Sequence, residues 1–184
     1  SAHRANYRQF ADVARIGCKL GVDRVWADRV IPCGRGESLR AELLTPEETL
    51  ELFQIMSRAR AEARRRWLNR TEIAMHRALQ FLVGGGPPYH CTAGDSLLAV
   101  DANGDLYPCR RMPVRVGNVL ETPLLELYHE SPLLVALRDR RHVEGCEHCL
   151  HARSCRGGLR CLAYAVTGEP FRADPGCWLS SALP

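Results

Sequence analysis

Residues 146–177 read CEHCLHARSCRGGLRCLAYAVTGEPFRADPGC, a segment dense in cysteine. Cys146 and Cys149 are separated by two residues, so one tight turn can direct both sulfur atoms to the same point. Cys155 follows after five further residues, and Cys177 closes the segment after a short predicted helix. Four thiolates from one compact segment suit either a tetrahedral zinc ion or an iron–sulfur cluster. The segment therefore predicts a metal centre.

The rest of the composition is ordinary for a globular chain. The 184 residues are 46% apolar and 25% charged, and the net charge of +4 does not by itself indicate nucleic-acid binding. Nine cysteines, an odd number, and an N-terminus without the apolar stretch of a signal peptide argue against a secreted disulfide framework. No apolar run approaches the roughly 18 residues of a membrane span. We therefore expect a cytoplasmic protein without membrane contact, whose thiolates are held by metal.

The first half of the chain is predicted to combine helices with a strand. Apolar periodicity predicts a helix over residues 5–20, and the β-branched and aromatic residues of 22–31 predict a strand. The sequence TPEE, starting at Thr45, predicts a helix N-terminus with a capping box. Another helix is predicted over 71–82, and the glycines and prolines of 84–88 end it. This order is typical of βα units, although one clear strand cannot complete a barrel.

The second half is predicted to consist of short strands, turns and short helices. Residues 96–101 alternate weakly, Asn103-Gly104 is a strong hairpin-turn signal, and 105–110 form the returning strand. The glycine–proline segment before this region marks the boundary between the two halves.

An arginine-rich run at residues 58–67 is a candidate nucleic-acid contact. On a helix its arginines spread around much of the circumference, and beyond Trp67 the run offers no aromatic platform for base stacking. We interpret the run as a solvated helix face and expect no nucleic-acid partner.

Further cysteines precede the segment 146–177. Cys91 is followed by twelve residues, Gly104, four residues and Cys109. The segments DANGDLYPC, ending at Cys109, and GNVLETPLLELY lie in the same region. From about residue 89 to 178, this pattern resembles the SPASM domain, the C-terminal auxiliary-cluster domain of many radical S-adenosylmethionine enzymes. In the first half, GVDRVWADRVIPCGRG and LLTPEE resemble the last strands and helices of the partial barrel of such enzymes.

The resemblance implies an α+β fold in two parts. Residues 1–86 would be the C-terminal part of a partial (β/α) barrel, and 87–184 a small SPASM domain with one or two auxiliary [4Fe–4S] clusters. The family holds its radical-generating cluster in a C-x3-C-x2-C loop, which does not occur in these 184 residues. S-adenosylmethionine and that cluster would then belong outside this chain, and we expect no radical initiation from the chain alone. Cys18 and Cys33 stand apart and are interpreted as structural.

The resemblance also implies two sets of cluster ligands. The second auxiliary cluster would take Cys146, Cys149, Cys155 and Cys177. The first would take Cys91, Cys109 and a cysteine four positions after Cys155, but Leu159 stands there and the available cysteine is Cys161. Because two helical residues rotate a side chain by about 200°, Cys161 is expected to point away from the usual ligand position. Three outcomes stay open: a re-formed turn that lets Cys161 bind, a first cluster lacking one protein ligand, or no first cluster.

Zinc is the alternative metal on spacing alone. A closed zinc site would be satisfied by Cys146, Cys149, Cys155 and Cys177. His148 or His151 could replace a sulfur, although we interpret both as turn residues. The resemblance favours iron and sulfide. Arginines adjacent to ligand cysteines could raise a cluster's reduction potential by their charge, or be ordinary surface residues. They are Arg110, Arg111, Arg156 and Arg160.

By this resemblance, the parent enzyme would modify a peptide or protein, as a ribosomal-peptide maturase, with the clusters serving electron transfer or substrate positioning. Formylglycine formation, as in sulfatase maturation, is an alternative within the family. An alternative from another class is a non-catalytic module that uses its metal to fold and binds a peptide or partner. Expected partners are a peptide or protein substrate, an electron-donor protein, and a second copy of the chain through apolar faces of the barrel portion.

Overall fold

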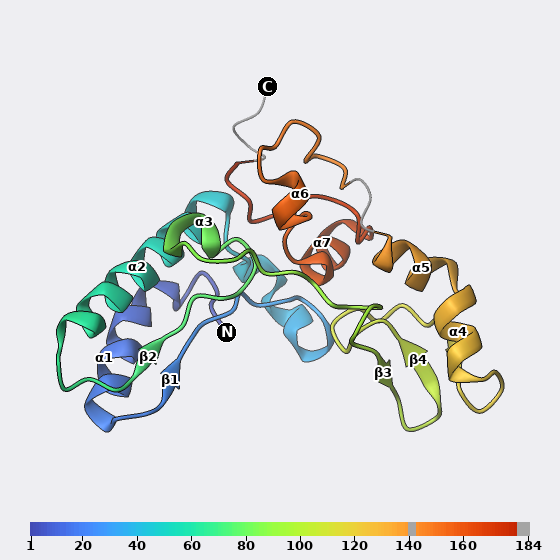
Figure 1. Cartoon of the computed structure of the whole chain (residues 1–184), viewed down its shortest axis with the longest axis horizontal. Helices are drawn as coiled ribbons and strands as arrows, with labels where there is room; N and C mark the ends of the chain where they lie inside the picture. The colour runs from blue at the N-terminus through green and yellow to red at the C-terminus, as the bar shows by residue number, and fades with distance from the viewer. Residues whose placement is uncertain (140–142, 180–184) are drawn as a thin grey trace.

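The computed structural model describes residues 1–139 and 143–179 as a mixture of helices and small sheets. The elements in chain order are η1 (Tyr7–Gln9), α1 (Phe10–Leu20), β1 (Arg24–Val25), η2 (Gly34–Glu42), α2 (Pro46–Arg65), β2 (Glu72–Ile73), α3 (Phe81–Gly84), β3 (Ala99–Val100), β4 (Asp105–Tyr107), β5 (Gly117–Asn118), α4 (Leu124–Glu130), α5 (Pro132–Arg138), α6 (Ala152–Cys155) and α7 (Arg160–Thr167). In Figure 1, α1, α2, β1 and β2 lie at one end, β3, β4, α4 and α5 lie at the other, and α6 and α7 lie between them. This content fits the predicted α+β fold.

β1 and β2 form a parallel pair, and α2 is the helical connection between them. The register pairs Arg24 with Glu72 and Val25 with Ile73. The strand predicted over 22–31 is therefore much shorter than expected. α1 and α2 pack together around a core that includes Phe10, Leu52, Phe53 and Met56.

α2 begins as its sequence predicts. The Thr45 hydroxyl accepts a hydrogen bond from the Glu48 backbone N–H at 3.2 Å, and the Thr45 N–H donates to the Glu48 carboxylate at 2.9 Å. Such N-caps stabilise a helix by about 0.5–2 kcal/mol. In the arginine-rich C-terminal turns, Ala59 and Ala63 face the core, and Trp67 beyond the helix is 90% exposed. The interpretation of this run as a solvated face agrees with that burial pattern.

The helix predicted over 71–82 is wrong. The residues around Thr71 and Ile73 instead form β2, and α3 begins only at Phe81. Thr71 and Ile73 are β-branched, and the exposed edge of β1 offers them a backbone partner, so strand pairing overrides the helical pattern. Gly85, with φ of +68°, then ends α3 in a conformation that glycine readily adopts.

The second half contains a three-stranded antiparallel sheet in the order β3–β4–β5. Gly104, with φ of +89°, occupies the predicted hairpin turn between β3 and β4. Leu106 from the sheet packs with Met112, and with Leu134 and Leu137 of α5, in a separate core cluster. Among the described residues, no helix is both long and apolar enough to cross a membrane.

Candidate metal centres

Four of the five cysteines of the segment 146–177 line one cavity, and we call them the four-cysteine group: Cys146, Cys149, Cys155 and Cys177. Leu79 and Leu82, from the first half of the chain, close the cavity on its apolar side. His151 also lines it, and its ring packs edge-to-face on Phe81 with 5.6 Å between the ring centroids. His148 is exposed and does not line the cavity. The predicted ligand set is thus brought to one place by segments that include both halves of the chain.

Local turns position the sulfur atoms of this group. The Cys149 N–H donates to the Cys146 carbonyl at 3.1 Å, which closes the turn that separates them. Cys155 is the last residue of α6, and the Cys177 N–H donates to the Asp174 carbonyl at 2.9 Å. After α6 the chain reverses through Gly157 and Gly158, whose φ values of +80° and +75° favour glycine.

The sulfur atoms of the four-cysteine group interact with one another electrostatically. Burial raises the pKa of Cys155 to about 12, and the nearby Cys177 sulfur raises it further. Burial likewise raises the pKa of Cys146 to about 11, followed by the effects of Cys177 and Cys149. Several thiolates in one buried place repel each other, and a soft metal cation relieves that repulsion. The donor chemistry of the group therefore fits a thiolate-bound iron–sulfur cluster.

Three more cysteines line a second cavity of about 480 Å³, and we call them the three-cysteine group: Cys91, Cys109 and Cys161. Burial raises the pKa of Cys161 to about 12, and the adjacent Cys91 sulfur adds to the shift. The Cys91 sulfur accepts backbone hydrogen bonds from Ala93 and Arg160. The Cys109 sulfur accepts one from the Arg111 N–H at 3.5 Å. Such N–H···S bonds offset negative charge on thiolate ligands, so this group also fits an iron–sulfur cluster.

The position of Cys161 differs from the expectation that it would point away from the first ligand set. Leu159 is the N-cap of α7 and has an extended backbone, with φ of −88° and ψ of 99°. The helical rotation of two residues therefore does not separate Leu159 from Cys161. Both side chains line the cavity of the three-cysteine group, and Cys161 is 6% exposed. The structure therefore places Cys161 at the same cavity as Cys91 and Cys109, and its binding to a cluster stays a prediction.

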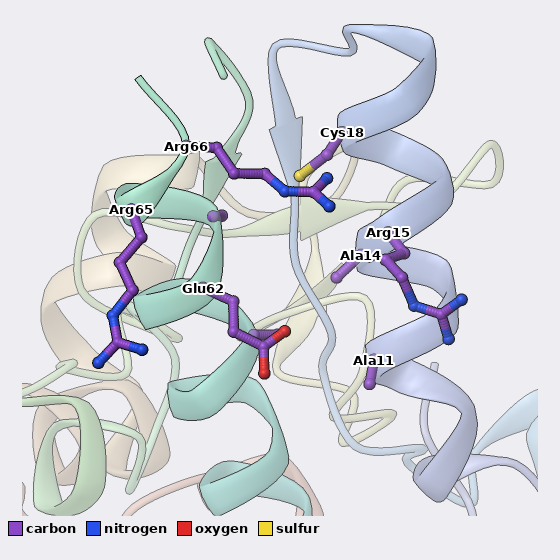
Figure 2. A pocket seen from close by; sticks show the side chains of 9 residues that line it. Ala11, Ala14, Arg15, Cys18, Glu62, Arg65 and Arg66 are labelled. Atoms are coloured by element: carbon purple, nitrogen blue, oxygen red, sulfur yellow. The ribbon is translucent and has the colours of Figure 1, made fainter. Parts of the chain in front are cut away.

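Within the described residues, no three histidine, cysteine or acidic side chains converge closely enough to hold a single metal ion. The remaining cysteines lie apart from both groups. Cys18 in α1 lines a groove between α1 and α2, with Arg15 and Glu62 nearby (Figure 2). Cys33 precedes η2 as its N-cap residue and lines neither cysteine cavity.

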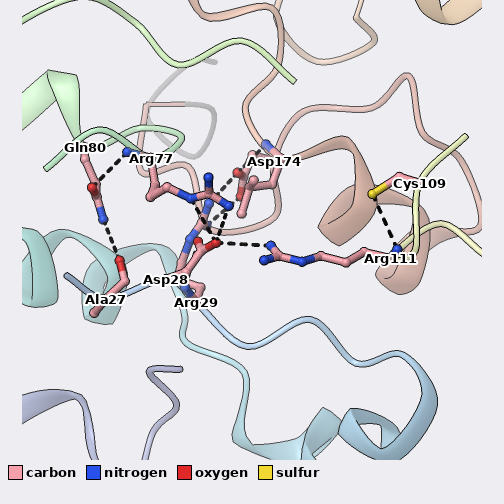
Figure 3. A network of polar contacts seen from close by, with 9 residues as sticks. Ala27, Asp28, Arg29, Arg77, Gln80, Cys109, Arg111 and Asp174 are labelled. Atoms are coloured by element: carbon pink, nitrogen blue, oxygen red, sulfur yellow. Dashed lines mark hydrogen bonds and ion pairs between the residues drawn. The ribbon is translucent and has the colours of Figure 1, made fainter. Parts of the chain in front are cut away.

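A polar network that the sequence does not signal includes residues lining each of the two cysteine cavities (Figure 3). Asp28 accepts hydrogen bonds from Arg77 at 2.9 Å and from Arg111 at 3.1 Å, and both arginines line the cavity of the three-cysteine group. The next residue, Arg29, forms a buried two-bond ion pair with Asp174, at 2.7 and 2.6 Å. Asp174 lines the cavity of the four-cysteine group. Asp28 thus bonds to residues that line the cavity of the three-cysteine group, and Arg29 bonds to a residue that lines the cavity of the four-cysteine group. No local sequence signal reveals this relation.

The arginines beside the cysteines occupy different environments. Arg110 is exposed, and Arg111 forms an ion pair with the Asp28 carboxylate. Arg156 has φ of +55°, in the left-handed region, and ends α6. Arg160 is only 5% exposed.

Comparisons with known proteins agree with the cysteine pattern. The family model SPASM, described as an iron-sulfur cluster-binding domain, matches residues 91–150. An AdoMet-dependent heme synthase of Methanosarcina barkeri is 33% identical over 88 residues, which are 47% of this chain and 25% of that protein. A pre-heme d1 synthase of Dinoroseobacter shibae is 36% identical over 94 residues, which are 49% of this chain and 23% of that protein.

A PqqA peptide cyclase of Streptomyces rochei is similar over almost the whole chain. It is 28% identical over 183 residues, which are 97% of this chain and 49% of that protein. The chain therefore spans about a quarter to a half of the length of these curated relatives. Together these matches confirm the predicted resemblance to radical S-adenosylmethionine/SPASM-family proteins. They also support an iron–sulfur cofactor.

Proposed function

We propose that this chain is the auxiliary-cluster portion of a peptide-modifying radical S-adenosylmethionine/SPASM enzyme. The observation that carries the proposal is the gathering of seven cysteines around two cavities, with four at one and three at the other. Similarity to PqqA peptide cyclases along 97% of the chain supports a peptide as the substrate class. An electron-donor protein is the further partner that the proposal requires.

In this proposal residues 1–86 are the last part of a partial barrel, and residues 87–184 are the SPASM domain. The parallel β1–α2–β2 unit supports the barrel assignment, because parallel strands joined by a helix are the repeating unit of such barrels. The Asp28 and Arg29 contacts would hold this unit against both cysteine groups.

The four-cysteine group would hold one [4Fe–4S] cluster with a complete set of thiolates. The three-cysteine group would hold a second cluster and leave one iron without a cysteine ligand. When bound, the clusters would supply one-electron redox chemistry next to the substrate. The chain's own contribution would be to fix the sulfur atoms by turns and to donate backbone N–H groups to Cys91, Cys109 and Cys155.

Anaerobic reconstitution with iron and sulfide tests the proposal. We expect brown protein with iron and acid-labile sulfide in equal amounts, and no 5′-deoxyadenosine after addition of dithionite and S-adenosylmethionine, because the C-x3-C-x2-C motif does not occur in these residues. Cys149→Ser should lose part of the iron, whereas Cys18→Ser, remote from both cavities, should keep all of it. Uptake of zinc alone, or formation of 5′-deoxyadenosine, would contradict the proposal.

A further inference from the structure

Arg160 is a buried cation whose hydrogen-bonding groups are not all satisfied. Arg160 is 5% exposed, and its Nη1 atom is buried without a hydrogen-bond partner. None of the ion pairs found within residues 1–139 and 143–179 includes it. Buried arginines are normally paired with an anion, because an uncompensated charge in the interior is costly. The position therefore calls for a negative partner.

The surroundings of Arg160 show where that partner would lie. The guanidinium lies over the Phe171 ring, 5.2 Å from its centroid, so one of its faces is occupied by an aromatic side chain. Burial lowers the pKa of Arg160, the nearby Cys91 sulfur acts in the opposite direction, and Arg156 lowers the pKa further. The Arg160 backbone N–H also donates to the Cys91 sulfur. The Arg160 backbone thus contacts the three-cysteine group, and its guanidinium lies within electrostatic range of the Cys91 sulfur.

We propose that Arg160 is the built-in counter-charge of the iron–sulfur centre held by the three-cysteine group, and that it raises the reduction potential of that centre. This inference rests on the proposed function. Reduction adds one electron to the centre and breaks no bond, so the reduced form carries one more negative charge. A fixed cation close to the centre, away from water, stabilises the reduced form more than the oxidised form.

Neighbouring arginines cannot supply the same effect. Arg110 lines the cavity of the same group but is exposed, so solvent and salt screen its charge. Arg111 donates to Asp28 at 3.1 Å, and that carboxylate offsets its charge. Arg160 combines burial with the absence of a carboxylate partner among the described residues. Arg110 is therefore the matched control, because it carries the same charge and, like Arg160, directly follows or precedes a cysteine of the three-cysteine group, but is exposed.

The test is a potentiometric titration of the reconstituted chain, with dithionite as reductant and electron paramagnetic resonance as the readout. For Arg160→Gln we expect at least a tenfold shift of one centre toward its oxidised form, which corresponds to a potential lower by about 59 mV for a one-electron couple. Arg160→Lys should stay near the wild-type potential because it keeps the charge. Arg110→Gln should shift the same equilibrium less than about threefold, since its charge is screened. The second centre serves as an internal reference.

Each outcome decides a separate claim. If the wild-type chain takes up no iron and sulfide, the proposed function fails. If it does, and Arg160→Gln leaves both potentials unchanged or shifts them no more than Arg110→Gln, the role of Arg160 is overturned. If Arg160→Gln loses one centre while Arg160→Lys retains it at the wild-type potential, charge compensation is supported. Loss of the centre in both variants overturns it, because a positive charge would then not suffice.

Discussion

Replacement of Asp174 by asparagine tests how the first half of the chain is fixed to the cysteine sites. Asp174 is 1% exposed and Arg29 is 4% exposed. One carboxylate oxygen accepts from Arg29 Nη1 at 2.7 Å and from the Gly176 N–H at 2.9 Å. The other accepts from Arg29 Nη2 at 2.6 Å and from the Leu159 N–H at 2.9 Å. The Asp174 carboxylate thus joins Arg29, which follows β1, to Leu159, which precedes α7.

Asparagine keeps the shape of the side chain but removes its charge and replaces one acceptor by a donor. Arg29 would remain buried without a counter-ion. The amide N–H group of the new asparagine would also face a donor, either the Arg29 guanidinium or a backbone N–H of Leu159 or Gly176. Breaking a buried ion pair by removing one partner costs about 3–5 kcal/mol. The exposed pair between Arg172 and Glu144, with side chains 47% and 65% exposed, is the control. Its loss in Glu144→Gln should cost less than about 1 kcal/mol.

Urea unfolding followed by circular dichroism provides the comparison, on protein prepared anaerobically with the same iron content. We expect Asp174→Asn to lower the free energy of unfolding by about 3–5 kcal/mol. In a double-mutant cycle, adding Arg29→Met should recover part of this loss, since no unpaired charge would remain. A loss under about 1 kcal/mol, or one equal to that of Glu144→Gln, would refute the reasoning.

Three further predictions concern other positions. Cys161→Ser should lower the iron content, and a second change, Leu159→Cys, should restore it because both side chains line one cavity; iron analysis without recovery would contradict this. Gly168→Ala should lower the free energy of unfolding by about 1–2 kcal/mol, because the backbone at Gly168 is left-handed. Gly158→Ala should lower it more, because the new Cβ would also lie 2.6 Å from a carboxylate oxygen of the buried Asp174. Equal losses in urea unfolding would contradict this prediction. Burial raises the pKa of Tyr7 to about 12, and a hydrogen bond to Glu51 contributes to the same shift. The stability that the protonated Tyr7 contributes is therefore complete below about pH 10 and is lost as the pH rises toward 12. Tyr7→Phe should remove this pH dependence of the unfolding free energy.

Local features of the fold were predictable from local sequence. The capping box at Thr45 and the hairpin turn at Gly104 depend on residues within a few positions of each other, and both occur as predicted. The apolar periodicity of residues 5–20 predicted the helix α1, but not all of its apolar residues are buried. Phe10 and Gly17 are buried, but Ile16 is 57% exposed, because the helix turns a face of small residues toward α2.

Features that depend on distant partners were not predictable. The helix expected over 71–82 failed because the strand β2 exists only through pairing with β1, about fifty residues earlier. The pair of Arg29 and Asp174 joins residues 145 positions apart, and no local pattern signals it. The cysteine spacing predicted which side chains gather, but the side on which Cys161 lies depends on the extended backbone at Leu159. That conformation is held by a hydrogen bond from the Leu159 N–H to Asp174.

Mössbauer spectroscopy of the iron-57-loaded chain, combined with variants of one cysteine from each group, tests the central claim most directly. The account predicts cluster signals in the wild type, loss of one set of signals in Cys155→Ser, and loss of a different set in Cys91→Ser. A well-folded wild-type chain that carries no iron–sulfur signal, or whose signals are the same in both variants, would contradict the assignment of the two cysteine groups to two centres.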